Sequence, residues 1–280
     1  MELPMTMAIS GNSDPFRDVR KVHVNVLRDF DKILVDRHGL DDQAFMVLEN
    51  LIGHVAPGKA YRIEDQGLTE VAAGTLTALT SAPSKDDTGL RYAEFSGEWD
   101  ATVEGGADES NILGGNGTLT VPEGVIKVPV IATTAENVAA FGATLLKTGD
   151  IIEFQTEEFL PVTVTNIGAT YVKNFLYVEG KGGGAYIEYH DRPHFHMPLE
   201  DDAHGYLLLA KVVDGQYRAA AFAIPRGFAI YTGPNVLHAD SFLIGRYAVV
   251  YSVTDHFSTV LFKDGQGRMV EIEIDESSAA

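Results

Sequence analysis

The chain of 280 residues contains no cysteine. Disulfide bridges, thiolate metal ligands and cysteine nucleophiles are therefore excluded, and any metal must be held by nitrogen and oxygen atoms. Long hydrophobic runs are missing too, since no stretch approaches the roughly 18 apolar residues that a membrane-spanning helix needs. The first residues also lack the basic and then apolar layout of a secretory signal. These absences predict a cytoplasmic protein that does not enter a membrane.

Positive charge is scarce in this sequence. Lys and Arg together number 21 against 40 Asp and Glu, which gives a formal net charge of -19. Nucleic acids and anionic membranes require a concentrated basic surface, and the sequence has no Lys/Arg cluster. We therefore predict neither as a partner and interpret the excess acid as a solubility feature. A small-molecule substrate is the partner that remains.

Two helices are predicted near the N-terminus. The first covers residues 14–34, although its valine content leaves a strand over 21–27 as an alternative. Asp41 and Asp42 would cap the second helix, over residues 43–54. Beyond these segments the character of the sequence changes to short runs rich in Val, Thr, Tyr and Phe that Gly, Asp, Asn and Pro separate.

The density of short strands predicts a mainly β chain. From Ile151 onward, strand patterns recur at intervals of about ten residues, which favours an antiparallel barrel or sandwich. We expect a helical and β-rich region over residues 1–125, which would be a degenerate half if the chain held two barrels. Residues 126–280 would form the barrel that carries most of the histidines. Open barrel edges tend to be paired, so a homodimer is predicted.

Three histidines have the spacing of a metal site. His194 and His196 are two residues apart, so on a strand their side chains share a face, and His238 follows a Gly/Pro turn about forty residues later. The fourth ligand is either Glu200 or His204, and the residue that is not a ligand would be a catalytic acid or base. This pattern resembles the metal site of the cupins, which are small β-barrels that hold one divalent cation. Imidazole and carboxylate ligands suit Zn, Fe, Mn, Ni or Co, and the sequence does not select among them.

Further residues are candidates for the lining of the same site. Glu188 and His190 precede the histidine pair with the same strand parity, and metal-bound imidazoles need partners for their second ring nitrogen. His190 is also a candidate for substrate binding, together with Tyr231, Arg246 and Tyr251. An arginine at such a site would hold a substrate carboxylate through two hydrogen bonds. The alternative for Arg246 is a surface ion pair.

Three markers in residues 131–255 resemble one known family. Residues 131–142 have the pattern of a short helix that ends in an aromatic residue followed by glycine. Residues 194–199 precede an apolar strand, and residues 235–238 read Asn-Val-Leu-His. In this order and spacing the markers resemble the ureidoglycolate lyase family, a member of the cupin superfamily. The resemblance implies a cupin barrel and conversion of ureidoglycolate to glyoxylate and urea.

The chain departs from that family at the motif residues. His194 and His196 stand where the family has Gln and Phe, and Leu237 stands where it has Trp. These departures imply altered chemistry, altered metal dependence or both. The expected function is therefore a metal-dependent lyase that acts on a small polar, carboxylated metabolite. An Fe-dependent dioxygenase, a sugar-acid isomerase and a non-catalytic cupin that binds a small ligand are the alternatives.

Overall fold

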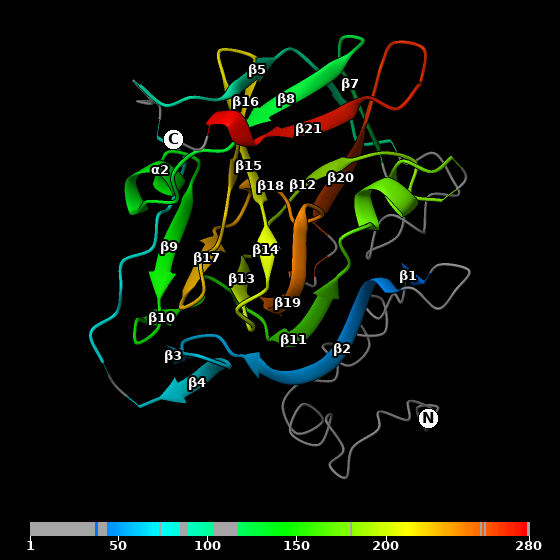
Figure 1. Ribbon diagram of the computed structural model, residues 1–280. Coiled ribbons are helices and arrows are strands. Elements are labelled where there is room, and N and C mark those ends of the chain that lie inside the picture. Colours follow the sequence, from blue (N-terminus) through cyan, green and yellow to red (C-terminus); the bar gives the residue numbers. More distant parts are fainter. Residues whose placement is uncertain are drawn as a thin grey trace.

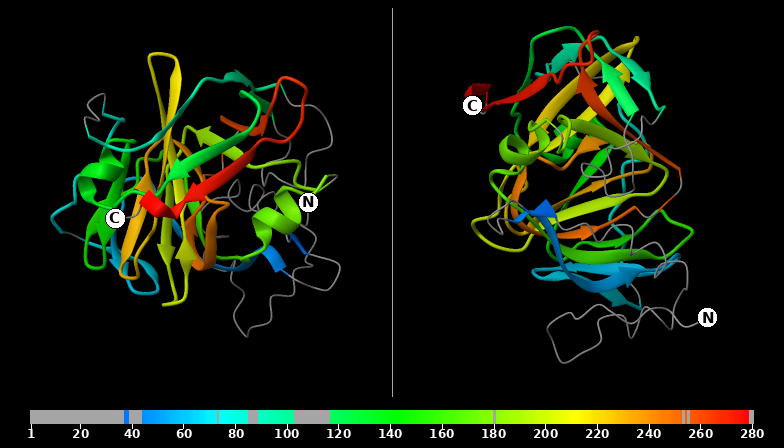
Figure 2. Two further views of the ribbon diagram at one scale, coloured as in Figure 1. Left: turned by 45° about the horizontal axis from the view of Figure 1, so that its top comes forward. Right: turned by 90° about the vertical axis from the view of Figure 1, so that its right-hand side faces the viewer.

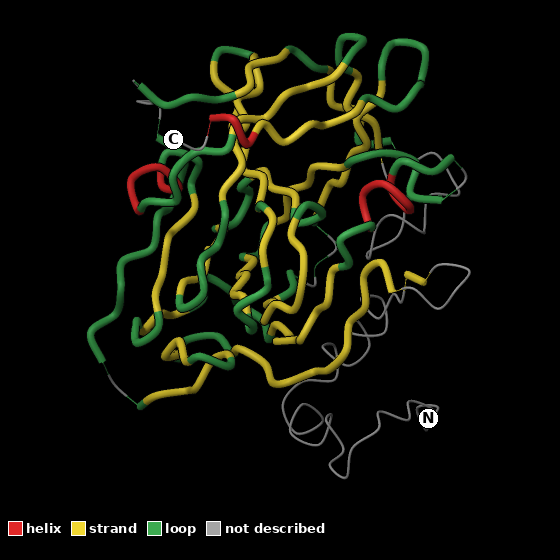
Figure 3. The backbone as a smooth tube through the Cα atoms, viewed as in Figure 1, coloured by secondary structure: helices red, strands yellow, loops and turns green. Residues whose placement is uncertain are grey.

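The computed structural model describes residues 37–38, 44–72, 74–84, 89–102, 117–179, 181–252, 254 and 256–278. The helix predicted over residues 14–34 lies outside them. Within them the chain is mainly β, as the sequence predicts (Figures 1 and 3). The helical elements of this part are short: α2 (Ala135–Ala139), a π-helical turn (Val172–Leu176) and a 3-10 turn (Glu276–Ser278).

The first large sheet has the strand order β1-β2-β11-β19-β13-β17-β9, and β14 pairs with β19. Its strands are β1 (Arg37–His38), β2 (Ala44–Val55), β11 (Leu160–Ile167), β19 (Leu243–Val250), β13 (His194–Pro198), β17 (Phe228–Thr232), β9 (Ala143–Lys147) and β14 (His204–Gly205). Figure 1 shows how β2 curves along the edge of this sheet beside β11. Strand β13 lies inside the sheet, between β19 and β17, so both of its edges are hydrogen-bonded.

The second large sheet faces the first and has the order β5-β16-β15-β18-β12-β20-β7-β6 (Figure 2). Its strands are β5 (Ala93–Phe95), β16 (Gln216–Phe222), β15 (Leu207–Val213), β18 (Leu237–Ala239), β12 (Tyr186–His190), β20 (Phe257–Lys263), β7 (Gly117–Thr120) and β6 (Glu98–Asp100). The pairing is antiparallel except between β20 and β7, which run parallel.

Two smaller sheets complete the described part. A small sheet is formed by β10 (Ile151–Glu153), β3 (Ala60–Glu64) and β4 (Gly67–Val71). A parallel ribbon is formed by β21 (Glu271–Asp275) and β8 (Val125–Pro129). A bridge from Val130 to Ala221 joins the ribbon to the second sheet.

The prediction of a helix over residues 43–54 is wrong, because this segment forms β2. Its backbone pairs antiparallel with β11, and the register shifts twice along the pair. Each shift is a bulge that lets the face of the strand change. Phe45, Met46, Leu48 and Leu51 are therefore all buried although they do not alternate strictly. Their irregular spacing resembles a helical pattern, which explains the error.

The strands before residue 126 extend the sheets that the later strands form. Strand β2 pairs with β11, β5 with β16, and β7 with β20. Among the described residues, the N-terminal block therefore does not build a barrel of its own. Regions 1–125 and 126–280 share both large sheets and the core between them.

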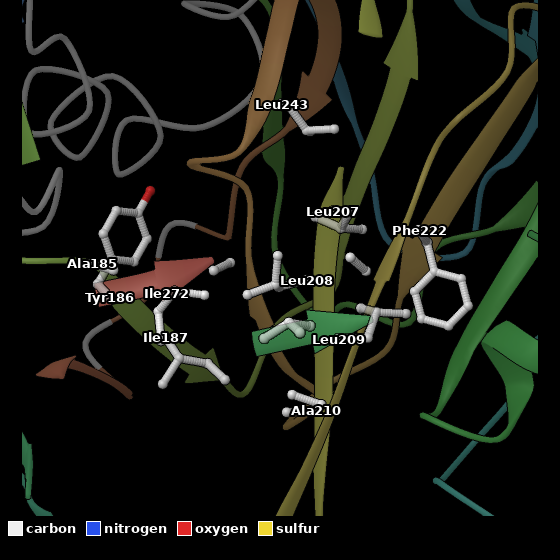
Figure 4. Packing of buried hydrophobic residues seen from close by; sticks show 14 of the residues in the cluster. Ala185, Tyr186, Ile187, Leu207, Leu208, Leu209, Ala210, Phe222, Leu243 and Ile272 are labelled. Atoms are coloured by element: carbon white, nitrogen blue, oxygen red, sulfur yellow. The ribbon is translucent and has the colours of Figure 1, made fainter. Parts of the chain in front are cut away.

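The first large sheet separates two hydrophobic cores. One core fills the space between the two large sheets and continues through the second sheet to the ribbon; Figure 4 shows part of it, with Leu207 to Ala210 of β15 and Ile187 of β12. The other core lies between the first sheet and the small sheet, and it contains Phe195 and Met197 of β13. Because side chains alternate along a strand, His194 and His196 must point the other way, toward the second sheet.

Truncation of Leu209 tests the core between the large sheets. Leu209 is fully buried and lies opposite His238 of β18, whereas Val212 of the same strand is 52% exposed. We expect Leu209→Ala to lower the free energy of unfolding by about 2–5 kcal/mol, and Val212→Ala to change it by less than about 0.5 kcal/mol. Urea denaturation of both variants measures the difference. Equal losses would contradict the assigned facing of β15.

Candidate metal centre

Three histidines from the two facing sheets converge on one point. His190 ends β12 and His238 lies in β18, which is the neighbour of β12 in the second sheet, while His194 begins β13 in the first sheet. All three are buried, and one ligand nitrogen from each lies within 4.8 Å of the others. The ring centroids are 4.5 to 5.0 Å apart. Such a set of nitrogen donors is able to hold one metal ion.

Backbone carbonyls fix the tautomers of two of these rings. The Nδ1 atom of His190 is 2.7 Å from the carbonyl oxygen of Arg192, and Nδ1 of His238 is 2.8 Å from that of Val236. A carbonyl oxygen only accepts, so each Nδ1 carries the hydrogen and each Nε2 carries a lone pair. Neither Nε2 has a hydrogen-bond partner among the residues that the structure describes. Metal-bound histidines are typically supported in this way.

Burial keeps these imidazoles neutral. Loss of hydration, helped by the neighbouring His238, lowers the pKa of His190 to about 3. Burial likewise lowers the pKa of His238 to about 4, despite the opposing hydrogen bond to Val236. The pKa of His194 is well below its ordinary value for the same reason, with His190 and His238 contributing. At neutral pH all three rings have the protonation state that a metal ligand requires.

A buried pair of His196 and Asp240 lies beside the three histidines. Nε2 of His196 is 3.4 Å from Oδ2 of Asp240, and the Tyr186 hydroxyl donates to Oδ1 of Asp240 at 2.6 Å. Burial by itself raises the pKa of Asp240, but the hydrogen bonds from His196 and Tyr186 outweigh it, so the pKa lies below its ordinary value. The interior therefore contains a carboxylate charge held against an imidazole.

Several polar atoms around the centre have unused hydrogen-bonding capacity. Nδ1 of His196 and Oγ1 of Thr232 are buried without a partner in the described part of the chain. Thr232 lies opposite His194 in the β13–β17 pair, so the two side chains share the inner face. The Tyr251 ring meets His194 edge-on at 5.6 Å, and its hydroxyl is 3.1 Å from that of Thr165. Buried polar atoms are normally paired, so this interior is suited to a polar ligand or water.

The structure places Glu200 and His204 outside this centre. The Glu200 carboxylate is 2.5 Å from Arg246, and its side chain is 41% exposed. His204 is exposed, and its Nδ1 contacts the carbonyl oxygen of Asp202 at 2.7 Å. The expectation that one of them is the fourth ligand therefore needs correction. Strand β13 ends at Pro198 and a turn follows, so strand parity cannot carry Glu200 to the inner face.

Two expected substrate contacts lie on the far face of the first sheet. Tyr231 is the cross-strand partner of Phe195, so it packs toward the small sheet, where its hydroxyl contacts Gln155. Arg246 is bound by Glu49 as well as Glu200, which is the surface ion pair that the sequence left as an alternative. Tyr251, another of the expected substrate contacts, lies on the inner face beside His194.

His190 belongs to the group of three, although the sequence suggested a substrate contact or an outer support. His196, expected as a ligand, is outside this group and pairs with Asp240. Sequence reasoning missed Asp240. Asp240 lies two residues after His238, so an extended chain would place both side chains on the same face. This spacing was the signal in the sequence that could have identified it.

Comparisons of the chain with protein family models, with curated proteins and with solved structures found no match. The resemblance of residues 131–255 to ureidoglycolate lyases therefore stays a prediction. Within the described ranges, no helix is both long and apolar enough to cross a membrane.

The neutral histidines predict that the metal-free protein loses stability in mild acid. Below pH 6.5 the unfolded chain binds protons on these rings, whereas folded His238 and His190 stay neutral down to about pH 4 and 3. The contribution of the neutral rings to the free energy of unfolding should therefore be fully present above pH 6.5. It should decrease as the pH falls, by about 1 to 2 kcal/mol for one histidine between pH 6.5 and 5.

Urea denaturation of chelator-treated protein at pH 7.5 and pH 5.0 measures this loss. His238→Gln removes one of the groups and should show a smaller pH dependence than the wild type. A wild-type protein that is equally stable at both pH values would contradict the neutral, buried state of the rings.

Proposed function

We propose that the protein is a metal-dependent enzyme whose ion is bound by His190, His194 and His238. The observation that carries this proposal is the buried group itself: one ring nitrogen from each of the three histidines lies within 4.8 Å of the others. In two of the rings a carbonyl fixes the hydrogen on Nδ1 and leaves the lone pair on Nε2. Three protein ligands leave coordination positions for water or substrate, which is typical of catalytic sites, whereas structural zinc sites are closed by four ligands. Nitrogen ligands suit Zn, Fe, Mn or Ni.

A bound divalent ion would supply Lewis-acid chemistry by polarising an oxygen of the substrate. The chain itself supplies the proton acceptor. Nε2 of His196 donates toward Asp240, so Nδ1 carries the lone pair and is able to accept a proton from a substrate hydroxyl. Asp240 orients the ring and stabilises the imidazolium that forms, while Tyr186 holds the carboxylate. The Thr232 hydroxyl is available to position a polar group of the substrate.

We propose lyase chemistry on a small carboxylated metabolite, with ureidoglycolate as the first substrate to test. Nδ1 of His196 would take the proton of the substrate hydroxyl, the C–N bond would break to give glyoxylate, and the proton would return to the departing urea nitrogen. The polar inner face and the resemblance of residues 131–255 support this choice. A cytoplasmic homodimer stays part of the proposal.

Metal analysis of two histidine variants tests the centre. We expect close to one equivalent of a divalent metal in the wild type, a loss of most of it in His190→Gln, and full retention in His204→Gln. The reason is that His190 presents a buried lone pair to the centre, whereas His204 is exposed and remote from the group of three. Elemental analysis of tag-free protein, with circular dichroism as a folding control, measures the content.

Absence of metal from the wild type after reconstitution would contradict the proposed enzyme. Equal loss in both variants would contradict the ligand assignment. Bound Fe together with oxygen uptake would contradict the lyase and favour the alternative function of a dioxygenase.

Removal of His196 tests the proton transfer. We expect His196→Gln to keep its metal and to lower kcat/KM for release of glyoxylate from ureidoglycolate by about 10²- to 10⁴-fold, because it removes the acceptor without removing a ligand. His204→Gln should retain wild-type turnover. A coupled assay for glyoxylate measures both. A metal-loaded wild type that releases no glyoxylate would overturn the lyase, and an active His196→Gln would overturn the role of His196.

A further inference from the structure

The turn between β12 and β13 connects two of the three histidines. His190 is the last residue of β12 and His194 is the first residue of β13. The residues between them, 191–193, belong to no strand, so regular strand pairing does not fix their orientation. The carbonyl oxygen of Arg192 nevertheless accepts the hydrogen bond from Nδ1 of His190 at 2.7 Å. The direction of one metal-binding ring therefore depends on what holds this turn in place.

The hydroxyl of Ser252 contacts two carbonyl oxygens of the turn. Its Oγ is 3.1 Å from the carbonyl oxygen of Arg192 and 2.6 Å from that of Pro193. Carbonyl oxygens only accept, so the hydroxyl donates its hydrogen to this pair. Ser252 is 3% exposed, so the contact lies away from bulk water. The carbonyl oxygen of Arg192 thus accepts from the ring of His190 and from the hydroxyl of Ser252.

Two backbone contacts hold the main chain of this region. The amide of Asn235 donates to the carbonyl oxygen of His190 at 2.7 Å, and the amide of Asp191 donates to that of His256 at 3.1 Å. These bonds fix the backbone at the end of β12, but they leave the imidazole free to rotate about its side-chain bonds. The ring is oriented by the carbonyl of Arg192, and Ser252 is the side chain that bonds to this carbonyl.

We propose that Ser252 is a positioning residue of the metal centre. By holding the carbonyl of Arg192, its hydroxyl keeps the hydrogen of His190 on Nδ1 and the lone pair of Nε2 directed at the other two histidines. This inference rests on the proposed metal centre and deepens it. Without the hydroxyl, the carbonyls of Arg192 and Pro193 lose a buried donor, and the turn moves to replace it. A ring that must be ordered when the ion binds lowers the affinity.

The Zn²⁺ affinities of a double-variant cycle test this role. We expect Ser252→Ala to weaken Zn²⁺ binding about 10-fold, which is the effect of losing outer support for a metal-bound histidine. In the His190→Gln background the same change should weaken binding by less than about threefold, because Ser252 acts through that ring. The absorption bands of Co²⁺-loaded protein should also change in Ser252→Ala. Competition with a chelator measures the affinities.

Ser258→Ala is the matched control. Ser258 is also a buried serine, and its hydroxyl accepts a hydrogen bond from Nε1 of Trp99 at 3.0 Å. It lies opposite Tyr189 in the β12–β20 pair, so its side chain is on the face opposite to that of His190. We expect Ser258→Ala to bind Zn²⁺ like the wild type and to keep its Co²⁺ spectrum. Equal weakening in both serine variants would overturn the role of Ser252.

A Ser252→Ala variant that binds Zn²⁺ within threefold of the wild type and keeps its Co²⁺ spectrum would also overturn it, as would fully additive losses in the cycle. Both results leave the three-histidine centre intact, whereas a wild type that binds neither metal would overturn the proposed function itself.

Should Ser252→Ala fail to fold, a crystal structure of the Zn²⁺-loaded wild type decides. An ion bound by Nε2 of His190, with the Ser252 hydroxyl within about 3.2 Å of the carbonyl oxygen of Arg192, supports the proposal. Binding through Nδ1, or a hydroxyl that no longer contacts this oxygen, overturns it.

Discussion

The position of β13 between two cores is the constraint on which the site depends. Phe195 and Met197 are fully buried against the small sheet, so the alternation of the strand sends His194 and His196 into the space between the large sheets. Pairing with β17 and β19 on both edges fixes the register. A slip by one residue would exchange histidines for Phe and Met on both faces, at the cost of both cores.

The polar interior that results is expensive to bury and is organised to reduce that cost. The histidines stay neutral, and the carbonyl oxygens of Arg192 and Val236 each accept a hydrogen bond from one ring, at Nδ1 of His190 and Nδ1 of His238. The buried Asp240 beside the histidines is held by His196 and Tyr186. The buried side-chain atoms without a hydrogen-bond partner among the described residues are one ring nitrogen of each of the four histidines, the hydroxyls of Thr232 and Ser241, and Nε of Arg192. The proposed metal and substrate site would give these atoms partners, as buried polar atoms normally have.

Much of the local structure could be predicted, since it depends on neighbours in the sequence. The strand patterns near residues 186–189 and 229–231 correspond to β12 and β17. The hydroxyl of Thr134 caps α2 at the amide of Asn137, within residues 131–142, where the sequence predicts a short helix. The error over residues 43–54 arose because two bulges against β11 decide which side chains are buried, and these depend on a partner more than a hundred residues away.

The sequence by itself determined the chemistry available to this protein: nitrogen and oxygen ligands without thiolate, a mainly β chain, and histidines two residues apart on one strand. Only the tertiary structure decided which of these residues meet. His190 joins His194 and His238 because β12 and β18 are neighbours in a sheet that faces β13. Glu200 does not join them, because β13 ends before this residue and Arg246 binds its carboxylate at the surface. Side-chain parity is a local property, whereas sheet order and strand ends follow from packing across the whole chain.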